Sequence, residues 1–277
     1  MDTTALVLTL LAALVHAGWN QLLAGSPDPQ ARVGVAMLVG AVATLPFALV
    51  GFHWDAAVWP YIAASVAFEL AYVVLLAAAY RVAPMSTVYP VARGSAPVLV
   101  LVVGVLLGTQ VGWLPALGAA LVVGGILLAR SPEHASTSGV LMALAVGACI
   151  AGYTLVDAHG VDHASVAAYL LAVLGLTAVT QVAIAARGRG VRDLTRAAFS
   201  RDEWWRTILA GLGFFLAYGL VLVALRTAPA GLVAAVRETS VVIAVLLLAA
   251  TGQEPLRART LLGAAVVTAG VALVVTG

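Results

Sequence analysis

Residues 57–80 read AVWPYIAASVAFELAYVVLLAAAY, and Glu69 carries the only formal charge in this apolar run. A helix needs about 20 mostly apolar residues to cross the hydrocarbon core of a bilayer, and this run is long enough. Strands of a membrane barrel alternate apolar and polar side chains, whereas this run is continuously apolar. The stretch therefore indicates a membrane-spanning helix with one acidic group inside it.

Runs of the same kind recur along the whole chain. The breaks between them carry turn-forming residues, such as Ser26-Pro27-Asp28-Pro29 and Gly252-Gln253-Glu254-Pro255. Ten spans are expected, at residues 4–24, 31–51, 57–80, 85–108, 112–130, 138–157, 164–186, 206–226, 230–251 and 259–276. We therefore predict an all-α integral membrane protein with ten transmembrane helices.

The composition of the chain supports the same class. Of 277 residues, 63% are hydrophobic and 9% are charged, and the mean hydropathy is +1.08. An ordinary soluble domain is about 25% charged, so lipid must be the solvent for most of this surface. The spans leave no room for a domain outside the membrane. We expect a multi-pass protein of the cell's inner membrane.

Motifs for catalysis and for metal binding do not occur in the sequence. Cys149 is the only cysteine, which excludes an intrachain disulfide and a metal site with several cysteines. No phosphate loop, metal motif or nucleophile elbow is present. His159 and His163, with Asp157 and Asp162 beside them, are interpreted as a solvated turn. We expect a protein that is not an enzyme and that uses no cofactor and no metal.

The second half of the chain repeats motifs of the first half in the same order. The matched pairs are FELAY at 68–72 with FFLAY at 214–218, Arg81-Val82-Ala83-Pro84 with Arg226-Thr227-Ala228-Pro229, and Gly118-Ala119-Ala120 with Gly263-Ala264-Ala265. Chance similarity between apolar runs is the alternative, and the shared order argues against it. Each unit holds five spans, and an odd number makes the second unit enter the membrane from the opposite side. We predict two inverted five-helix repeats, residues 1–132 and 133–277, with a site between them.

Arginines gather in the loops on one side of the predicted spans. The loops after the odd-numbered spans contain Arg32, Arg81, Arg130, Arg187, Arg189, Arg192, Arg196, Arg201, Arg206, Arg257 and Arg259, and the opposite loops contain Arg226. Basic loops stay in the cytoplasm, so the count places both termini outside. The longest of these loops, 187–206, is interpreted as a solvated segment that sets the orientation. No nucleic-acid partner is expected.

A few polar residues interrupt the apolar runs. The sequence places Glu69 in the third span, Arg93 in the fourth, Arg237 with Glu238 in the ninth, and His16 with Asn20 in the first. Charged groups at the centre of a membrane are costly, and they mark functional sites by default. We expect these groups to face one wet cavity. Static ion pairs within the bundle are the alternative.

Aromatic residues share helix faces with these polar groups. Residues three or four positions apart lie on one face of a helix. The pairs at this spacing are Trp19 with His16, Tyr72 with Glu69, and Tyr89 with Arg93, while Tyr153 and Tyr218 stand at the repeat positions of Trp19 and Tyr72. Such rings can stack on an organic substrate or on a cation. Plain packing is the alternative for each of them.

The fifth and tenth spans carry small residues in place of charges. These are Ala116, Ala120 and Gly124 in the fifth span, and Ala265 and Ala269 in the tenth. Small residues four positions apart let two helix backbones approach closely. The pattern indicates either close packing inside the chain or a homodimer contact through spans 5 and 10.

In this arrangement the chain resembles the drug/metabolite transporter superfamily, and within it the EamA-type transporters, over essentially its whole length. The resemblance is carried by His16-Ala17-Gly18-Trp19-Asn20, the aromatic-rich third span ending near Ala83-Pro84, Pro90 and Pro97 in the fourth span, and Gly252-Gln253-Glu254 followed by Gly263 and Gly270. One departure is Thr109-Gln110, where an acidic residue usually ends the fourth span. Glu254 keeps that residue in the other half.

The resemblance implies a secondary transporter, often an exporter of amino acids or related metabolites. It implies a central cavity lined by spans 1, 3, 4, 6, 8 and 9, with spans 5 and 10 at the back. It also implies that both termini lie in the cytoplasm, which is opposite to the orientation given by the arginine count.

These observations predict a secondary active transporter, and by resemblance an exporter, that moves a small polar metabolite such as an amino acid or organic anion by alternating access. Arg93 and Arg237 would bind a carboxylate. Glu69 and Glu238 would pair with them, bind an amine or take a coupling proton. His16 would handle a proton or remain a satisfied buried histidine, and Asn20 would lie in the site or hydrogen-bond between helices. A proton-coupled exporter of cationic drugs is the first alternative and a channel is the second.

Overall fold

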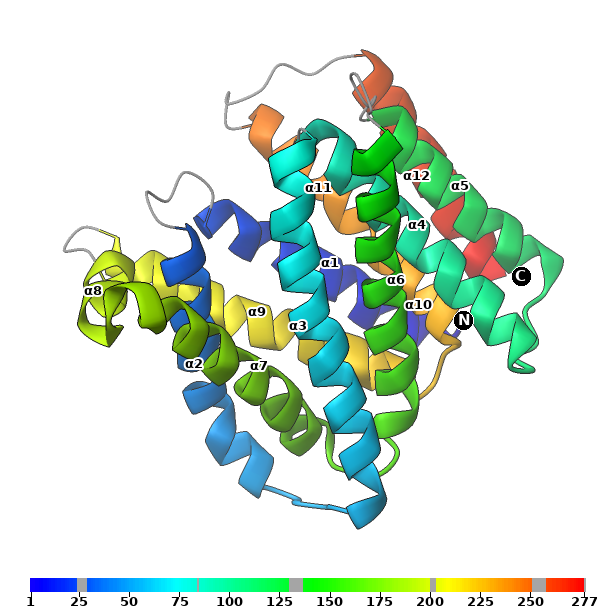
Figure 1. The fold of residues 1–277 in the computed structure, drawn as a ribbon. Coiled ribbons are helices and arrows are strands. Elements are labelled where there is room, and N and C mark those ends of the chain that lie inside the picture. The colour runs from blue at the N-terminus through cyan, green and yellow to red at the C-terminus, as the bar shows by residue number, and fades with distance from the viewer. Residues whose placement is uncertain (24–28, 84, 130–136, 200–202, 251–257, 277) are drawn as a thin grey trace.

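The computed structural model describes residues 1–23, 29–83, 85–129, 137–199, 203–250 and 258–276, and these are helical almost throughout (Figure 1). In chain order the elements are α1 (Thr3–Leu23), α2 (Pro29–Leu49), a 3₁₀ turn (Ala56–Val58), α3 (Trp59–Val82), α4 (Met85–Leu106), α5 (Trp113–Ala129), α6 (Thr137–Gly160), α7 (Val166–Arg189), α8 (Val191–Ala198), α9 (Trp204–Leu225), α10 (Ala230–Arg237), α11 (Thr239–Ala250) and α12 (Ala258–Thr276). The ends of most expected spans fall within a few residues of these helix ends.

The length of the apolar helices and the apolar outer surface of the bundle identify a membrane fold. Within the described residues, α1, α2, α3, α6, α7 and α9 are each long and apolar enough to cross a membrane, and shorter apolar helices lie within α4, α5 and α12. Large apolar side chains cover the outside: Leu106 is 79% exposed, Trp113 is 74% exposed and Phe47 is 68% exposed. A soluble protein does not present so many exposed apolar groups together. The protein is therefore a multi-pass membrane protein.

The expected ninth span, 230–251, is interrupted near its middle. α10 ends at Arg237, and Glu238 takes φ −68° and ψ −9° before α11 begins. The N–H of Glu238 is shared between the carbonyls of Ala234 and Ala235, each at 3.3 Å. Tightened hydrogen bonding of this kind interrupts a regular helix. The sequence pattern missed the break because apolar residues continue on both sides of it.

The helices pack into one bundle with a common core. α1 packs along α9, and α3 packs along α6. α4 lies against α6 and α10, α2 lies against α7 and α9, and α5 pairs with α12 at one edge (Figure 1). Ile62, Tyr169 and Leu222 are almost fully buried in the largest core cluster. Met1 packs in a cluster that also contains Val274, so the two termini lie at the same end of the bundle.

α5 and α12 touch backbone to backbone. A Cβ added to Gly118 would lie 2.5 Å from the carbonyl oxygen of Gly270, and one added to Gly125 would lie 2.7 Å from that of Gly263. The close packing inside the chain is thus made by Gly118, Gly125, Gly263 and Gly270. Of the small residues named from the sequence, Ala120, Ala265 and Ala269 are exposed. Gly124, one position before Gly125, is exposed and has nothing within 4 Å of its Cβ position. A homodimer contact through that outer face stays a prediction.

Loops from distant parts of the chain meet at one end of the bundle. This loop end consists of residues 50–58, 160–165 and 226–229. The backbone N–H of Asp55 donates to the carbonyl of His163 at 2.8 Å. The Asp55 carboxylate accepts the N–H of Ala57 at 3.0 Å and lies 3.4 Å from the ring of His163, and these contacts lower the pKa of Asp55. The connection between α2 and α3 is thereby fixed to the connection between α6 and α7.

Arg226, the exception to the arginine count, has a structural position at the loop end. Its guanidinium donates to the carbonyl of Val161 at 2.6 Å and to that of Ala164 at 2.7 Å. Carbonyls at the C-terminal end of a helix lack partners within the helix, and a basic side chain can satisfy them. Arg226 therefore fastens the end of α9 to the connection between α6 and α7.

The opposite end of the bundle contains α8, Arg32 and Glu203, and we call it the arginine end. It is also ordered by ion pairs. The expected loop 187–206 contains the short helix α8, with Leu194 and Ala198 buried on one face. Arg32, which was expected in a loop, is 1% exposed on α2, and its Nη2 lies 2.7 Å from Oε2 of Glu203. Hydrogen bonding to Arg32 lowers the pKa of Glu203. The expectation of a solvated loop was wrong because α8 buries Leu194 and Ala198, which lie four positions apart on one helical face.

Gly125→Ala should destabilise the protein, whereas Gly124→Ala should not. The Cβ at position 125 meets the backbone of α12, and overpacking of this kind costs about 1–3 kcal/mol. At position 124 the Cβ meets open space, and alanine is the better helix former by about 1 kcal/mol. Thermal unfolding of the two detergent-purified variants measures the difference. Equal melting temperatures would contradict the backbone contact between α5 and α12.

Candidate functional site

Side chains from six helices enclose a cavity of about 70 Å³. The helices are α1, α3, α4, α6, α9 and α10, which correspond to the six spans that the resemblance implies. The lining residues are Ala12, His16, Trp19, Glu69, Tyr72, Arg93, Tyr153, Phe214, Ala217, Tyr218, Val221 and Arg237. The cavity brings residues from both halves of the sequence into one polar space.

Most of the predicted site residues line this cavity, and Glu238 and Asn20 are not among the lining residues that the structure describes. The lining set contains His16, Trp19, Glu69, Tyr72, Arg93, Tyr153, Tyr218 and Arg237. Glu238 is 2% exposed and lies behind the cavity wall. The Asn20 amide donates to the carbonyl of His16, one turn back on its own helix, at 2.7 Å. That bond is neither of the two roles expected for Asn20. The side chain of Tyr89 lies outside the described residues.

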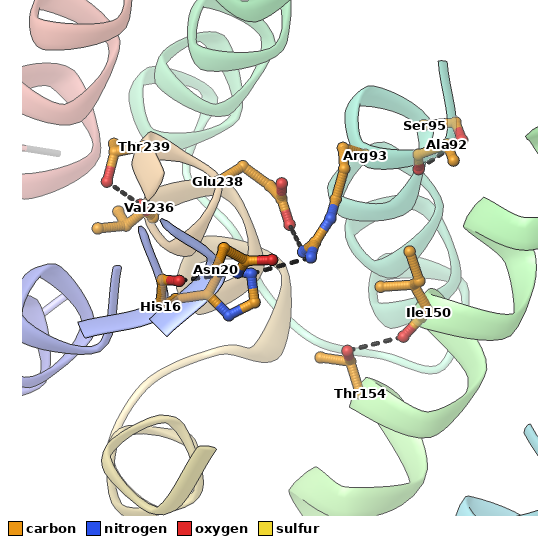
Figure 2. Close-up of polar contacts among 10 residues, drawn as sticks. All are labelled: His16, Asn20, Ala92, Arg93, Ser95, Ile150, Thr154, Val236, Glu238 and Thr239. Carbon is orange, nitrogen blue, oxygen red and sulfur yellow. Dashed lines mark hydrogen bonds and ion pairs between the residues drawn. The ribbon is translucent and has the colours of Figure 1, made fainter. Parts of the chain in front are cut away.

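Arg93 connects three segments of the chain. Figure 2 shows its guanidinium, carried by α4, between His16 of α1 and Glu238 at the break between α10 and α11. Nη1 lies 3.1 Å from Oε1 of Glu238, and Nη2 lies 3.0 Å from Nε2 of His16. Both partners of the ion pair are at least nine-tenths buried. The charge of Arg93 is therefore largely offset inside the protein.

The contact with Arg93 fixes the tautomer of His16. A guanidinium has donors and no acceptor, so Nε2 of His16 must accept in this contact. His16 is then neutral, with its proton on Nδ1. In this arrangement His16 holds Arg93 in place and carries no charge of its own.

Unlike Arg93, neither Arg237 nor Glu69 forms an ion pair within the described residues. Within the described residues, no hydrogen bond or ion pair is formed by the Arg237 guanidinium, which lies over the Tyr218 ring at 5.8 Å. The face of an aromatic ring attracts a cation. Glu69 is 7% exposed on α3 and also forms no hydrogen bond or ion pair within those residues. The cavity thus contains a cation and a carboxylate that are not committed to each other.

Aromatic rings form much of the remaining wall. The ring of Trp19 meets those of His16 and Phe214 edge-on, with centroids 4.9 Å apart in each case. Tyr153 and Tyr218 lie 6.1 Å apart. Phe214 was missed as a site residue although it begins the quoted FFLAY motif. Its position three residues before Ala217 and four before Tyr218 places it on the cavity face of α9.

Asp157 is the polar residue that the sequence interpretation placed wrongly. It lies inside α6, which continues to Gly160, and it is 1% exposed. Its carboxylate accepts a hydrogen bond from Tyr169 Oη at 2.7 Å and another from Tyr218 Oη. The turn residues that follow hid this position. The signal available was its spacing of four from Tyr153, which puts both on one helix face.

The cavity offers recognition groups: an uncommitted cation, a carboxylate and several rings. Among the described residues, no group of three His, Cys, Asp or Glu side chains is placed to hold a metal ion. Cations bind carboxylates by charge-assisted hydrogen bonds, and aromatic rings cover apolar or cationic parts of a solute.

Long apolar helices around a small charged cavity define the class, a multi-pass membrane protein with a polar interior of solute size. A family model for the EamA-like transporter family matches residues 137–276, which is half of the chain. The chain belongs to the EamA-like transporter family, within the drug/metabolite transporter superfamily. The family expectation is confirmed, and the protein is a membrane transporter, which implies a substrate and a surrounding lipid bilayer.

A solved structure supports the fold. It is described as "Crystal structure of protein" and has a TM-score of 0.80 at 15% sequence identity. The match covers 99% of this chain and 96% of that chain. At this identity the likeness concerns the fold alone. None of the curated proteins matches the sequence.

Glu238→Gln should destabilise the protein much more than Glu69→Gln. Removing one partner of a buried ion pair leaves the other charge uncompensated and costs about 3–5 kcal/mol. Glu69 has no such partner among the described residues. Thermal unfolding in detergent measures both variants, and adding Arg93→Gln to Glu238→Gln should recover part of the loss. Additive effects of the two changes would show that the pair does not couple.

Proposed function

We propose that the protein is a secondary active transporter for a small amino acid or a related organic anion, working by alternating access. The observation that carries the proposal is the Arg237 guanidinium. It faces the cavity and forms no ion pair within the described residues. A buried cation without a protein carboxylate is suited to bind one from a solute.

The two arginines take different parts in this proposal. Arg93 is held by Glu238 and His16, so it shapes the site and adds positive potential. Arg237 receives the substrate carboxylate. Glu69, in the same cavity, binds the amine of a zwitterionic substrate or takes a coupling proton when the substrate has none. The aromatic pair Trp19 and Phe214 contacts the rest of the solute.

The size of the cavity supports a small solute over a drug. Pockets for drug-sized ligands measure about 300–1,000 Å³, and this cavity measures about 70 Å³. Its charge also counts against a cationic drug, since the described lining contains two arginines and one carboxylate. A channel is less well supported, because bonded loops close over one end of the bundle.

The contacts between helices support two inverted repeats, residues 1–132 and 133–277. If the units are exchanged, α1 takes the place of α6, α3 that of α9, and α4 that of the broken helix α10–α11. The contact of α1 with α9 then maps onto that of α3 with α6. The contacts of α1 with α10 and α11 map onto that of α4 with α6. A site on the axis between such units suits a carrier whose halves rock about it.

Arg237→Gln should weaken substrate binding about 10- to 100-fold, because hydrogen bonds to charged groups contribute about 1.5–3 kcal/mol. Arg237→Lys should keep part of the binding, since the charge stays while the planar fork is lost. The measurement is binding and transport of a panel of amino acids and organic acids by reconstituted protein, with and without a pH gradient.

Arg192→Gln, on exposed α8, is the matched control and should behave as wild type. Glu69→Gln separates the substrate classes. It should weaken binding of an amino acid and spare the analogue that lacks the amine. Transport by Arg237→Gln at the wild-type rate and affinity would overturn the site.

We further propose that the arginine end faces the cytoplasm of a cell with an inner membrane, so that both termini and the loop end face outward. A cysteine placed at exposed Asp162 in a Cys149→Ala background should react in whole cells with an impermeant thiol reagent. A cysteine at exposed Arg192 should react only after the membrane is opened. The reverse pattern would support the orientation that the family resemblance implies.

A further inference from the structure

Three helices meet at one buried carboxylate outside the cavity wall. Asp157 of α6 accepts from Tyr169 of α7 at 2.7 Å and from Tyr218 of α9. We call these three residues the aspartate junction. Asp157 is 1% exposed, Tyr169 is 0% exposed and Tyr218 is 7% exposed. No cationic side chain forms a hydrogen bond or ion pair with Asp157 within the described residues, and both phenols donate to it there.

The backbone of α6 makes room for this junction. A Cβ on Gly160 would lie 2.5 Å from Oη and 2.5 Å from Cε2 of Tyr169. Glycine at this position lets the Tyr169 ring lie against α6, one turn beyond Asp157. The contact therefore needs a particular backbone as well as two particular side chains.

The junction lies between the cavity and the loop end. The Tyr218 ring lines the cavity beneath Arg237, while its hydroxyl reaches Asp157. Further along α9, Arg226 donates to carbonyls of the connection between α6 and α7. The same three helices are thus joined by two successive polar layers on this side of the cavity. One of those layers includes a residue of the cavity wall.

From this placement we infer that the aspartate junction is the gate that closes the cavity toward the loop end, with Tyr218 as the positioning residue that links gate and cavity. The inference rests on the proposed alternating access. Opening on this side requires α7 and α9 to leave α6, which breaks both phenol bonds. A buried polar group that loses its hydrogen-bond partners in a dry interior is costly, so the open state must replace both phenols or lose stability. A partly separated junction is therefore unfavourable, and the gate is stable only when fully closed or fully open.

Tyr218 connects the gate to the cavity, because its ring lines the cavity and its hydroxyl bonds to Asp157. A carboxylate bound at Arg237 lies beside the ring that the guanidinium covers, and it competes with that ring for the cation. Binding therefore alters the position of the same side chain that holds Asp157. The substrate and the gate are connected through one tyrosine, with no need for a longer path.

The experiment measures from which side of the membrane the cavity can be reached. Val221 lines the cavity one turn beyond Tyr218 toward the loop end, and Cys149 is the only native cysteine. In a Cys149→Ala, Val221→Cys background, an impermeant thiol reagent is applied from each side to reconstituted protein of known orientation. Tyr169→Phe should raise the labelling rate from the loop end about tenfold, which corresponds to one lost hydrogen bond, and lower it from the arginine end.

Asp157→Asn should shift labelling in the same direction, since an amide offers one acceptor oxygen in place of two. Tyr61→Phe is the matched control, because Tyr61 stacks on His163 at the loop end and lies outside the junction. It should label as the background does. Tyr169→Phe should also change the maximal transport rate more than the affinity, because it leaves the cavity untouched.

Unchanged labelling in Tyr169→Phe would overturn the gate. So would an equal increase from both sides, which would mean general loosening. If Asp157→Asn does not fold, Tyr169→Phe decides alone. The labelling needs no transported substrate, so it is read separately from the proposed function. If Tyr169→Phe shifts labelling toward the loop end while Arg237→Gln transports like wild type, the gate is supported and the proposed substrate site is wrong.

Discussion

An ionised side chain in the hydrocarbon core loses its hydration, and lipid offers nothing in exchange. The chain meets this constraint by turning Glu69, Arg93, Arg237 and Glu238 inward. Arg93 and Glu238 form an ion pair, whereas Glu69 and Arg237 face a space where water or a solute can solvate them. The apolar outer surface follows from the same constraint, since charges kept inside leave the outside free to contact lipid.

The break between α10 and α11 places two of these charges. It places Glu238 between α10 and α11, with its carboxylate within 3.1 Å of Arg93. It also places Arg237 in the last turn of α10, facing the cavity. The interrupted helix thus carries a carboxylate that pairs with Arg93 and, one residue before it, an arginine of the cavity wall.

The sequence was sufficient for what depends on local pattern, and insufficient for what depends on distant contacts. Apolar runs gave the positions of most helices, because a span must be continuously apolar whatever its neighbours are. The residues of the cavity wall were also foreseeable, since polar groups in such runs have only the interior to face. The break at Glu238 and the burial of Asp157 were not foreseeable in this way. Both depend on partners far away in the sequence, Arg93 for Glu238 and Tyr218 for Asp157. Asn20 donates to a backbone carbonyl on its own helix, a local contact that the sequence pattern did not predict.

Direct backbone contact between α5 and α12 restricts how the bundle can move. Helices separated by a layer of side chains can slide, because rotamers readjust between them, but touching backbones have no such layer. In the proposed arrangement α5 closes one unit and α12 closes the other, so shear along this seam is blocked and pivoting remains. A pivot at one edge gives the longest lever arm to the edge opposite, where α2 and α7 pack together (Figure 1).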